Sequence, residues 1–225
     1  MDLMGGMVVH AKRGDRENYR PLDSRLCPSS NPLDVAHALL ELYPFRQLYI
    51  ADLDAICGTG YHLDTVASLQ KELPDLEIWL DAGLSTLADL ARWSALDAQW
   101  VVGTENLQEE ASAITLLDRL GASAILSLDF HHQSRKGLAS LFEQPHLWPQ
   151  RVIAMTLDRV GSGSGPDMAL LELLQKQSGR DIFAAGGVRS THDLERLKQQ
   201  GICGALVASA LHDGKISAKD LTDFQ

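Results

Sequence analysis

The segments Asp52-Leu53-Asp54 and Gly83-Leu84-Ser85-Thr86 each occur a second time in the chain, as Thr156-Leu157-Asp158 and Gly187-Val188-Arg189-Ser190. With these anchors, residues 49–104 realign on residues 153–208 at an offset of about 104 residues. A repeat of this length indicates duplicated sets of strand and helix units, because solenoid repeats have periods of only about 20–50 residues. Two equal halves of this kind predict a barrel built by duplication.

Short apolar runs that end at turn residues mark seven strand candidates. They cover residues 48–53, 77–81, 99–102, 124–129, 151–156, 181–184 and 204–207. Helical spacing of apolar residues marks segments between them, with Ser85 and Ser190 as expected N-caps. These segments are 33–43, 61–73, 85–95, 107–119, 168–177 and 190–200. Strict alternation of strand and helix predicts an all-parallel sheet.

An eighth strand has to precede these seven, and its carboxyl end would be Met1-Asp2-Leu3. Because a barrel strand needs roughly five residues, we expect this first strand to be truncated. No composition shift or linker divides the chain. The sequence therefore predicts one (β/α)8 TIM-barrel domain over residues 1–225, with half-barrels at about 1–120 and 121–225.

The composition excludes several classes of partner. The 225 residues carry a formal net charge of −10, which argues against nucleic acid and against an anionic membrane surface. Three cysteines without metal-type spacing and no apparent targeting segment predict reduced thiols and a cytoplasmic protein. No apolar run approaches the ~18 residues of a spanning helix, so no membrane association is expected.

Barrel active sites lie at the carboxyl ends of the strands, and two aspartates occupy that position in opposite halves. Asp2 ends the first strand candidate and Asp129 ends the fifth, which places them across the mouth from each other. An aspartate at a strand end is also a common turn former or helix cap. Their equivalent positions in the two halves favour a general acid and base pair instead.

Small residues after the last three strands predict a phosphate site, because backbone N–H groups at such turns bind anions and glycine allows close approach. The residues are Gly161, Gly163, Gly186, Gly187, Arg189, Ala208 and Ser209. Tight packing at a turn is the alternative explanation. The mirror turns, with Gly83, Gly103 and Thr104, would form a second anion site, although Asp81 and Glu105 oppose phosphate there.

Four further residues are expected as possible substrate contacts: Asp52, Thr156, His131 and Arg13. Arg13 belongs to a cationic loop, 12–20, which would cover an anionic ligand or else be a solvated surface loop. The histidines lack the helical spacing of a metal site, so no metal is expected.

The same residues resemble the histidine-biosynthesis isomerase and cyclase family of half-barrel duplicates over essentially the whole chain. The resemblance rests on Asp52-Leu53-Asp54, Leu128-Asp129, Gly186-Gly187-Val188 and the ending from Gly204 to Ala210-Leu211. The chain is more similar to the isomerase than to the cyclase. Val8-Val9-His10-Ala11-Lys12 and Tyr19-Arg20-Pro21 resemble a divergent isomerase-like subgroup of methanogens and methylotrophs.

The chain departs from the isomerase pattern at three turns. Asp81-Ala82-Gly83-Leu84-Ser85 stands where the family has Gly-Gly-Gly-Ile-Arg, and Ala208-Ser209 stands where it has Gly-Arg. Val160-Gly161-Ser162 replaces Asp-Gly-Thr, and the active-site threonine of the family falls on Met155 or on Thr156. These departures predict a ligand with one phosphate and a neutral or cationic far end.

The resemblance implies an isomerase that performs an Amadori-type aldose-to-ketose rearrangement of an aminated sugar phosphate. It implies Asp2 as base and Asp129 as acid, with no cofactor. Two alternatives remain: a related barrel enzyme in tetrahydromethanopterin or methanofuran biosynthesis, and a non-catalytic homologue that binds a phosphorylated ligand.

Overall fold

The computed structural model describes residues 1–223 and contains the expected strands. The strands are β1 Asp2–Met4, β2 Met7–Val9, β3 Gln47–Asp52, β4 Glu77–Asp81, β5 Gln99–Gly103, β6 Ala124–His131, β7 Ser134–Lys136, β8 Arg151–Thr156, β9 Asp181–Ala185 and β10 Gly204–Leu206. The helices are α1 Pro32–Leu42, α2 Leu53–Ile56, α3 Leu63–Glu72, α4 Leu87–Arg92, α5 Glu110–Leu120, α6 Ala139–Glu143, α7 Met168–Ser178, α8 Thr191–Gln199, α9 Ser209–His212 and α10 Ala218–Thr222. The repeat noted in the sequence relates β3, β4 and β5 to β8, β9 and β10.

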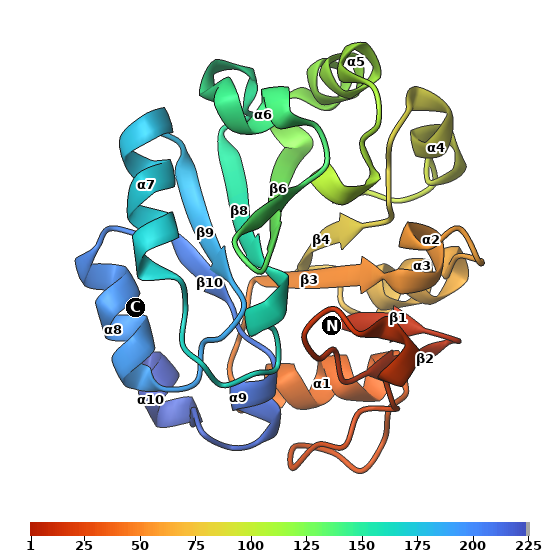
Figure 1. Cartoon of the computed structure of the whole chain (residues 1–225). Coiled ribbons are helices and arrows are strands. Elements are labelled where there is room, and N and C mark those ends of the chain that lie inside the picture. The colour runs from red at the N-terminus through yellow and green to blue at the C-terminus, as the bar shows by residue number, and fades with distance from the viewer. Residues whose placement is uncertain (224–225) are drawn as a thin grey trace.

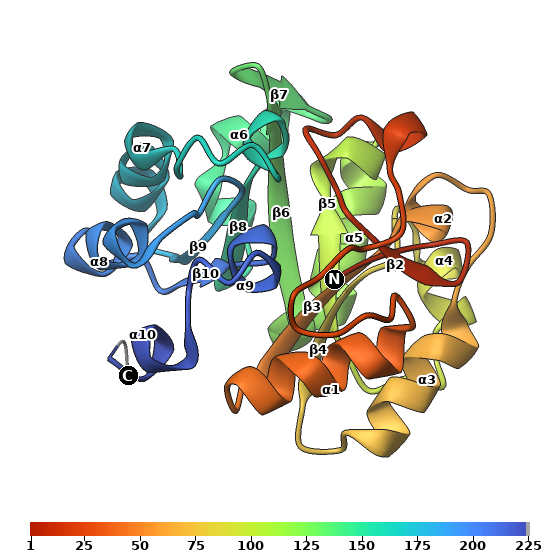
Figure 2. The ribbon, with the colours of Figure 1, turned by 90° about the horizontal axis from the view of Figure 1, so that it is seen from below.

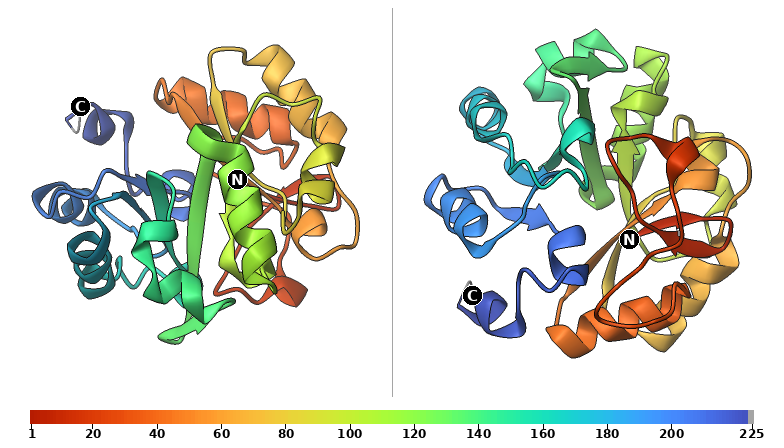
Figure 3. Two further views of the ribbon diagram at one scale, coloured as in Figure 1. Left: turned by 90° about the horizontal axis from the view of Figure 1, so that it is seen from above. Right: turned by 60° about the horizontal axis from the view of Figure 1, so that its bottom comes forward.

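The strands form one curled sheet in the order β10-β9-β8-β6-β5-β4-β3-β1-β2, with β7 paired to β6. Pairing is parallel throughout except in the hairpins β1–β2 and β6–β7, so the predicted parallel sheet is confirmed. Helices α4 to α8 lie around the outer side of this sheet (Figures 1 and 3). The first strand has three residues and pairs in parallel with β3.

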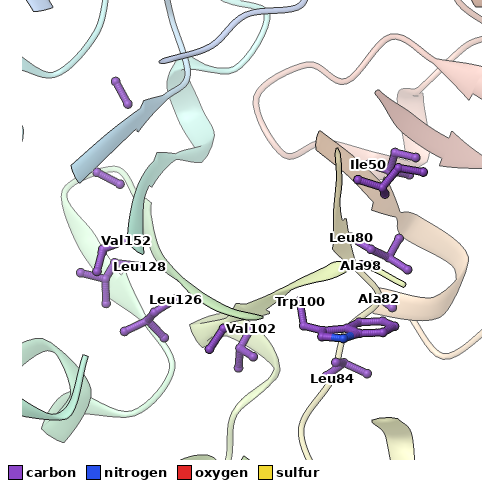
Figure 4. Packing of buried hydrophobic residues seen from close by; sticks show 14 of the residues in the cluster. Ile50, Leu80, Ala82, Leu84, Ala98, Trp100, Val102, Leu126, Leu128 and Val152 are labelled. Carbon is purple, nitrogen blue, oxygen red and sulfur yellow. The ribbon is translucent and has the colours of Figure 1, made fainter. Parts of the chain in front are cut away.

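Side chains alternate between the two faces of each strand. On the convex face, Leu80, Val102, Leu126 and Leu128 pack under the helices (Figure 4). Each such fully buried leucine stabilises the fold by about 1.5–3 kcal/mol. A smaller apolar cluster lies on the concave face: Trp79, Val101, Ile125, Ile153 and Ala185. Strands buried on both faces read as continuous apolar runs, which is why the sequence reveals them.

Four differences from the sequence predictions concern three short elements and one helix start. The sequence predictions lack strand β7, which forms a hairpin with the carboxyl end of β6 (Figure 2), and the one-turn helices α2 and α9. All three elements are too short to show a periodicity. Thr86, not Ser85, is the N-cap of α4, because Asp89 at the third helical position completes a capping box with Thr86. Ser190 is the N-cap of α8 as predicted. Within residues 1–223, no helix has both the length and the apolar character needed to cross a bilayer.

Candidate active site

A cavity of about 1460 Å³ opens at the carboxyl ends of the strands and extends down between β3 and β10. It brings together many residues that the sequence singles out: Asp2, Asp129, His131, Gly161, Gly163, Gly186, Gly187, Arg189, Ala208 and Ser209. The carboxylates come from β1 and β6, and the glycines from the turns after β8 and β9. One cavity therefore has carboxylates at one end and small residues at the other.

Asp129 is almost fully buried, with 4% of its surface exposed, and three donors hold its carboxylate. The Ser127 hydroxyl donates to Oδ1 at 2.7 Å, while the Thr104 hydroxyl and the Glu105 backbone N–H donate to Oδ2 at 3.1 and 3.0 Å. Burial nevertheless raises the pKa of Asp129 to about 7, with the Glu105 carboxylate adding to the shift against these hydrogen bonds. Asp129 can therefore donate a proton near neutral pH.

Asp81 lies beside Asp129 at the end of β4 and also lines the cavity. Its Oδ1 accepts from the Gly83 backbone N–H at 3.1 Å, and its Oδ2 accepts from the Tyr49 hydroxyl at 3.4 Å. Burial, followed by the charge of Asp129, raises the pKa of Asp81 to about 7. The sequence indicates Asp81 only as a negative charge opposed to phosphate, because its approach to Asp129 depends on the side-by-side packing of β4, β5 and β6.

Asp2 is half-buried and lines the cavity from the other side. Burial raises the pKa of Asp2, whereas the Met1 α-amino group, His10 and Arg16 lower it. Tyr49 of β3 also lines the cavity: burial and the charges of Asp81, Asp2, Asp129 and Glu105 all raise its pKa well above the usual range. Its hydroxyl is thus a neutral donor, and the sequence gives no signal for it.

The cationic loop reaches the cavity through Arg16, which forms an ion pair with Glu105. Arg13, the expected contact, is not in the cavity lining; its backbone N–H donates to the Val160 carbonyl at 2.9 Å and ties the loop to the turn after β8. The loop therefore spans the mouth from the glycine end to the carboxylate end. The sequence indicated this cationic loop, but it pointed to Arg13, whereas Arg16 is the arginine that lines the cavity.

The glycine end is shaped by close backbone contacts. A Cβ on Gly187, whose φ is +87°, would lie 2.3 Å from the Gly165 carbonyl oxygen, so only glycine fits there. Arg189 forms an ion pair with Asp193, with Nε 3.0 Å from Oδ2. His10, which the sequence analysis did not single out as a site residue, places Nε2 3.4 Å from the Ser209 hydroxyl.

The remaining candidates lie outside the cavity lining: Asp52, Gly83, Gly103, Thr104 and Thr156. Met155 lines the cavity and Thr156 does not, because neighbouring residues of a strand face opposite sides. Thr104 acts through its bond to Asp129. Gly83 packs on α2, where a Cβ would lie 2.7 Å from the Ile56 Cα.

Asp52 is fully buried and holds local structure. Its carboxylate accepts from the backbone N–H groups of Ala55 at 3.1 Å and His62 at 2.6 Å, and contacts His62 Nδ1 at 2.9 Å. His62 Nε2 in turn accepts from the Gly6 backbone N–H at 2.8 Å. Among residues 1–223, no group of three or more His, Cys, Asp or Glu side chains is arranged to hold a metal ion.

A curled parallel sheet with a cavity at the carboxyl ends of its strands defines an α/β protein of barrel type. The chain belongs to the histidine biosynthesis protein family, whose model matches residues 1–217. The predicted family resemblance is thereby confirmed.

Individual relatives span nearly the whole chain. An uncharacterized protein of Methanocaldococcus jannaschii is 28% identical, covering 98% of this chain and 95% of its own. The 1-(5-phosphoribosyl)-5-((5-phosphoribosylamino)methylideneamino)imidazole-4-carboxamide isomerase of Syntrophomonas wolfei is also 28% identical, covering 98% of this chain and 94% of its own. The protein of the same name from Thermococcus onnurineus is 26% identical, and the alignment covers 99% of this chain and 96% of that protein.

Proposed function

We propose that the protein is a phosphosugar isomerase that catalyses an Amadori-type aldose-to-ketose rearrangement of an aminated sugar phosphate. The observation that carries the proposal is Asp129, a buried carboxyl group in the cavity whose pKa lies at about 7. Membership of a family whose relatives are named isomerases supports the reaction type. A carboxyl group that keeps its proton near neutral pH suits the acid step of such a rearrangement.

In the proposed mechanism Asp129 gives its proton to the ring oxygen of the substrate. The bond between C1 and that oxygen breaks, its electron pair stays on oxygen, and the amine lone pair forms the C1–N double bond. Asp2 then removes the proton from C2, so that the C–H electron pair forms the enolamine. Asp2 then gives this proton to C1 and the enol O–H proton passes to Asp129, so that the C2–O double bond of the ketose forms and both carboxyl groups return to their starting states.

The proposed substrate has one phosphate, held by backbone N–H groups near Gly163, Gly187 and Ser209. The names of the related isomerases describe substrates with two phosphoribosyl groups. At the opposite end of this cavity the buried Asp81 and the Glu105 carboxylate replace an anion-binding turn. Glu105 is already paired with Arg16, but the ionised form of Asp81 repels a phosphate dianion by about a kcal/mol or more even at a high effective dielectric. A neutral or cationic group is therefore expected at that end.

The test has two arms. The purified protein is incubated with a series of N-substituted aldose monophosphates, and ketose formation is followed by NMR; absence of any ketose product would contradict the isomerase proposal. In the second arm, the gene is expressed in a histidine auxotroph that lacks the isomerase. We expect weak growth or none, and robust growth would show that the second phosphate is accepted after all.

A second candidate is a related barrel reaction in tetrahydromethanopterin or methanofuran biosynthesis, a cytoplasmic process. The similarity to the Methanocaldococcus jannaschii protein favours it. Deletion of the gene in a host that makes these cofactors, followed by mass spectrometry of accumulated phosphorylated intermediates, separates the two. Binding of phosphorylated ligands without turnover of any of them would favour a non-catalytic homologue.

We also propose that the curled sheet belongs to a (β/α)8 barrel closed between β10 and β1. The support is that β10 ends the strand order on one side, that β1 is the last parallel strand on the other side before the hairpin strand β2, and that the cavity is lined by residues of β3 and β10. Among residues 1–223 no pairing joins β10 to β1. Slow hydrogen exchange of the amides of Gly204–Leu206 would support closure, and exchange at the rate of an open edge would contradict it.

A further inference from the structure

The carboxylates of Asp81 and Asp129 converge on one point above β5. A Cβ built on Gly103 would lie 3.3 Å from Asp129 Oδ2 and 3.5 Å from Asp81 Oδ2. Gly103 is at the end of the strand that separates β4 from β6, and because it has no side chain both oxygens face the same point, which Asn106 Oδ1 also approaches to 3.9 Å. By these distances the oxygens are at most 6.8 Å apart, the sum of 3.3 and 3.5 Å.

Neither carboxylate has a neutralising cation. Within residues 1–223 no Lys, Arg or His forms an ion pair with Asp81 or Asp129, and Arg16 pairs with Glu105 instead. The charged and titratable groups that face the pair are Asp2 from β1, Tyr49 from β3, Glu105 after β5, Arg16 from the loop, and His131 and Lys136 from the β6–β7 hairpin. Two of these, Asp2 and Glu105, are further carboxylates, which increases the cost of ionising both members.

We propose that Asp81 and Asp129 titrate as one coupled pair that carries a single proton at neutral pH, so that ionisation of one member keeps the other protonated. Two buried carboxylates at this separation cannot both ionise without a strong repulsion in a site of low dielectric. The protons then leave in two steps that belong to the pair. Asp81 acts through Asp129 and needs no contact with the substrate.

Hydrogen-bond donors stabilise the two carboxylate anions to different extents, and this difference decides which carboxyl group holds the shared proton. Asp129 has three donors, two of them on the oxygen that faces Asp81, whereas the Tyr49 hydroxyl is the donor on the facing oxygen of Asp81. The three donors favour the Asp129 anion and so hold the shared proton mainly on Asp81, whereas the Tyr49 hydroxyl stabilises the Asp81 anion and so shifts the proton toward Asp129. The consequence for catalysis rests on the proposed function, but the coupling itself does not.

The experiment is a pH titration of the protein labelled with 13C at the aspartate side-chain carboxyl, followed by NMR. In Asp81→Asn the midpoint of Asp129 should fall by at least about one pH unit, as expected when a like charge at this range is removed. Asp129→Asn should lower the midpoint of Asp81 in the same way. Asp64→Asn, on the exposed side of α3, is the matched control and should move neither midpoint.

Tyr49→Phe gives a second, independent readout if Asp81→Asn does not fold. Loss of the hydroxyl should raise the midpoint of Asp81 and lower that of Asp129, because the shared proton moves to Asp81. Midpoints that stay unchanged, or that both move in one direction, would overturn the coupling. The titration requires no substrate, so its result stands whether or not the isomerase assay succeeds.

Discussion

At the scale of single residues, Asp129 shows which effect decides the state of a buried carboxyl group. Three hydrogen-bond donors favour its anion, and burial disfavours it. Burial prevails and places the pKa at about 7, because no cation accompanies the donors and the Glu105 carboxylate adds repulsion. A carboxyl group with a pKa near neutral pH can donate its proton to a substrate and then take up a proton again from its surroundings.

We predict that Asp129→Asn and Asp2→Asn each reduce turnover by about 10²–10⁴-fold, since this is the usual contribution of a general acid or base. Neither change adds bulk, so the affinity for the substrate should stay within about tenfold by calorimetry. Asp64→Asn serves as the control. A variant that retained more than a tenth of the wild-type rate would remove that aspartate from the mechanism.

At the scale of elements, the turn between β9 and α8 is built around a glycine that tolerates no side chain. We predict that Gly187→Asp abolishes binding of inorganic phosphate, because a Cβ would lie 2.3 Å from the Gly165 carbonyl oxygen and the new carboxylate would repel the anion. Gly179→Asp is the matched control: its φ is +62° and a Cβ there meets nothing within 4 Å. Equal phosphate affinity of the two variants by calorimetry would rule out the site.

A second element-scale prediction concerns the connection between α2 and α3. Asp52→Ala removes the acceptor of two backbone N–H groups and of His62 Nδ1, in a position with no exposed surface. Each buried donor left without a partner costs about 1–3 kcal/mol, so we expect the free energy of unfolding to fall by several kcal/mol in urea denaturation. Asp64→Ala, on the exposed face of α3, should change it by less than about 0.5 kcal/mol.

At the scale of the whole molecule, the raised pKa values of Asp81 and Asp129 make stability depend on pH. Both are raised from 3.8 to about 7, so the folded protein binds more protons than the unfolded chain across this window. The contribution of these two groups to the free energy of unfolding is therefore fully present below pH 4 and is lost as the pH rises through about 7. The slope is at most about 1.4 kcal/mol per pH unit for each proton.

His212 contributes with the opposite sign over part of this range. Burial lowers its pKa to about 4 from 6.5, so its contribution to stability grows as the pH rises through that interval. The double variant Asp81→Asn with Asp129→Asn isolates the carboxylate effect: between pH 5 and 8 its stability should fall less than that of the wild type. Parallel curves for the two proteins in urea titrations would contradict the raised pKa values.

The strand pattern, the repeat and the identity of the strand-end residues were accessible from sequence because they depend on local periodicity. Strands buried on both faces read as apolar runs, and the carboxyl ends of parallel strands lie at one edge of the sheet. Asp2 and Asp129 could thus be placed at the cavity, and so could the glycine turns after β8 and β9. The chain order alone was enough for this, without knowledge of any side-chain contact.

The tertiary structure alone decided how these groups act on one another. A shift of one residue within a strand reverses the face of a side chain, so the choice of Met155 over Thr156 required the register of β8 against its neighbours. The inward arginine of the loop is Arg16 rather than Arg13 because of a partner far along the chain, Glu105. Asp81 approaches Asp129 only because β4, β5 and β6 lie side by side and the residue of β5 between the two carboxylates, Gly103, has no side chain. Distances between side chains remote in sequence are set by tertiary packing, which a local sequence pattern does not show.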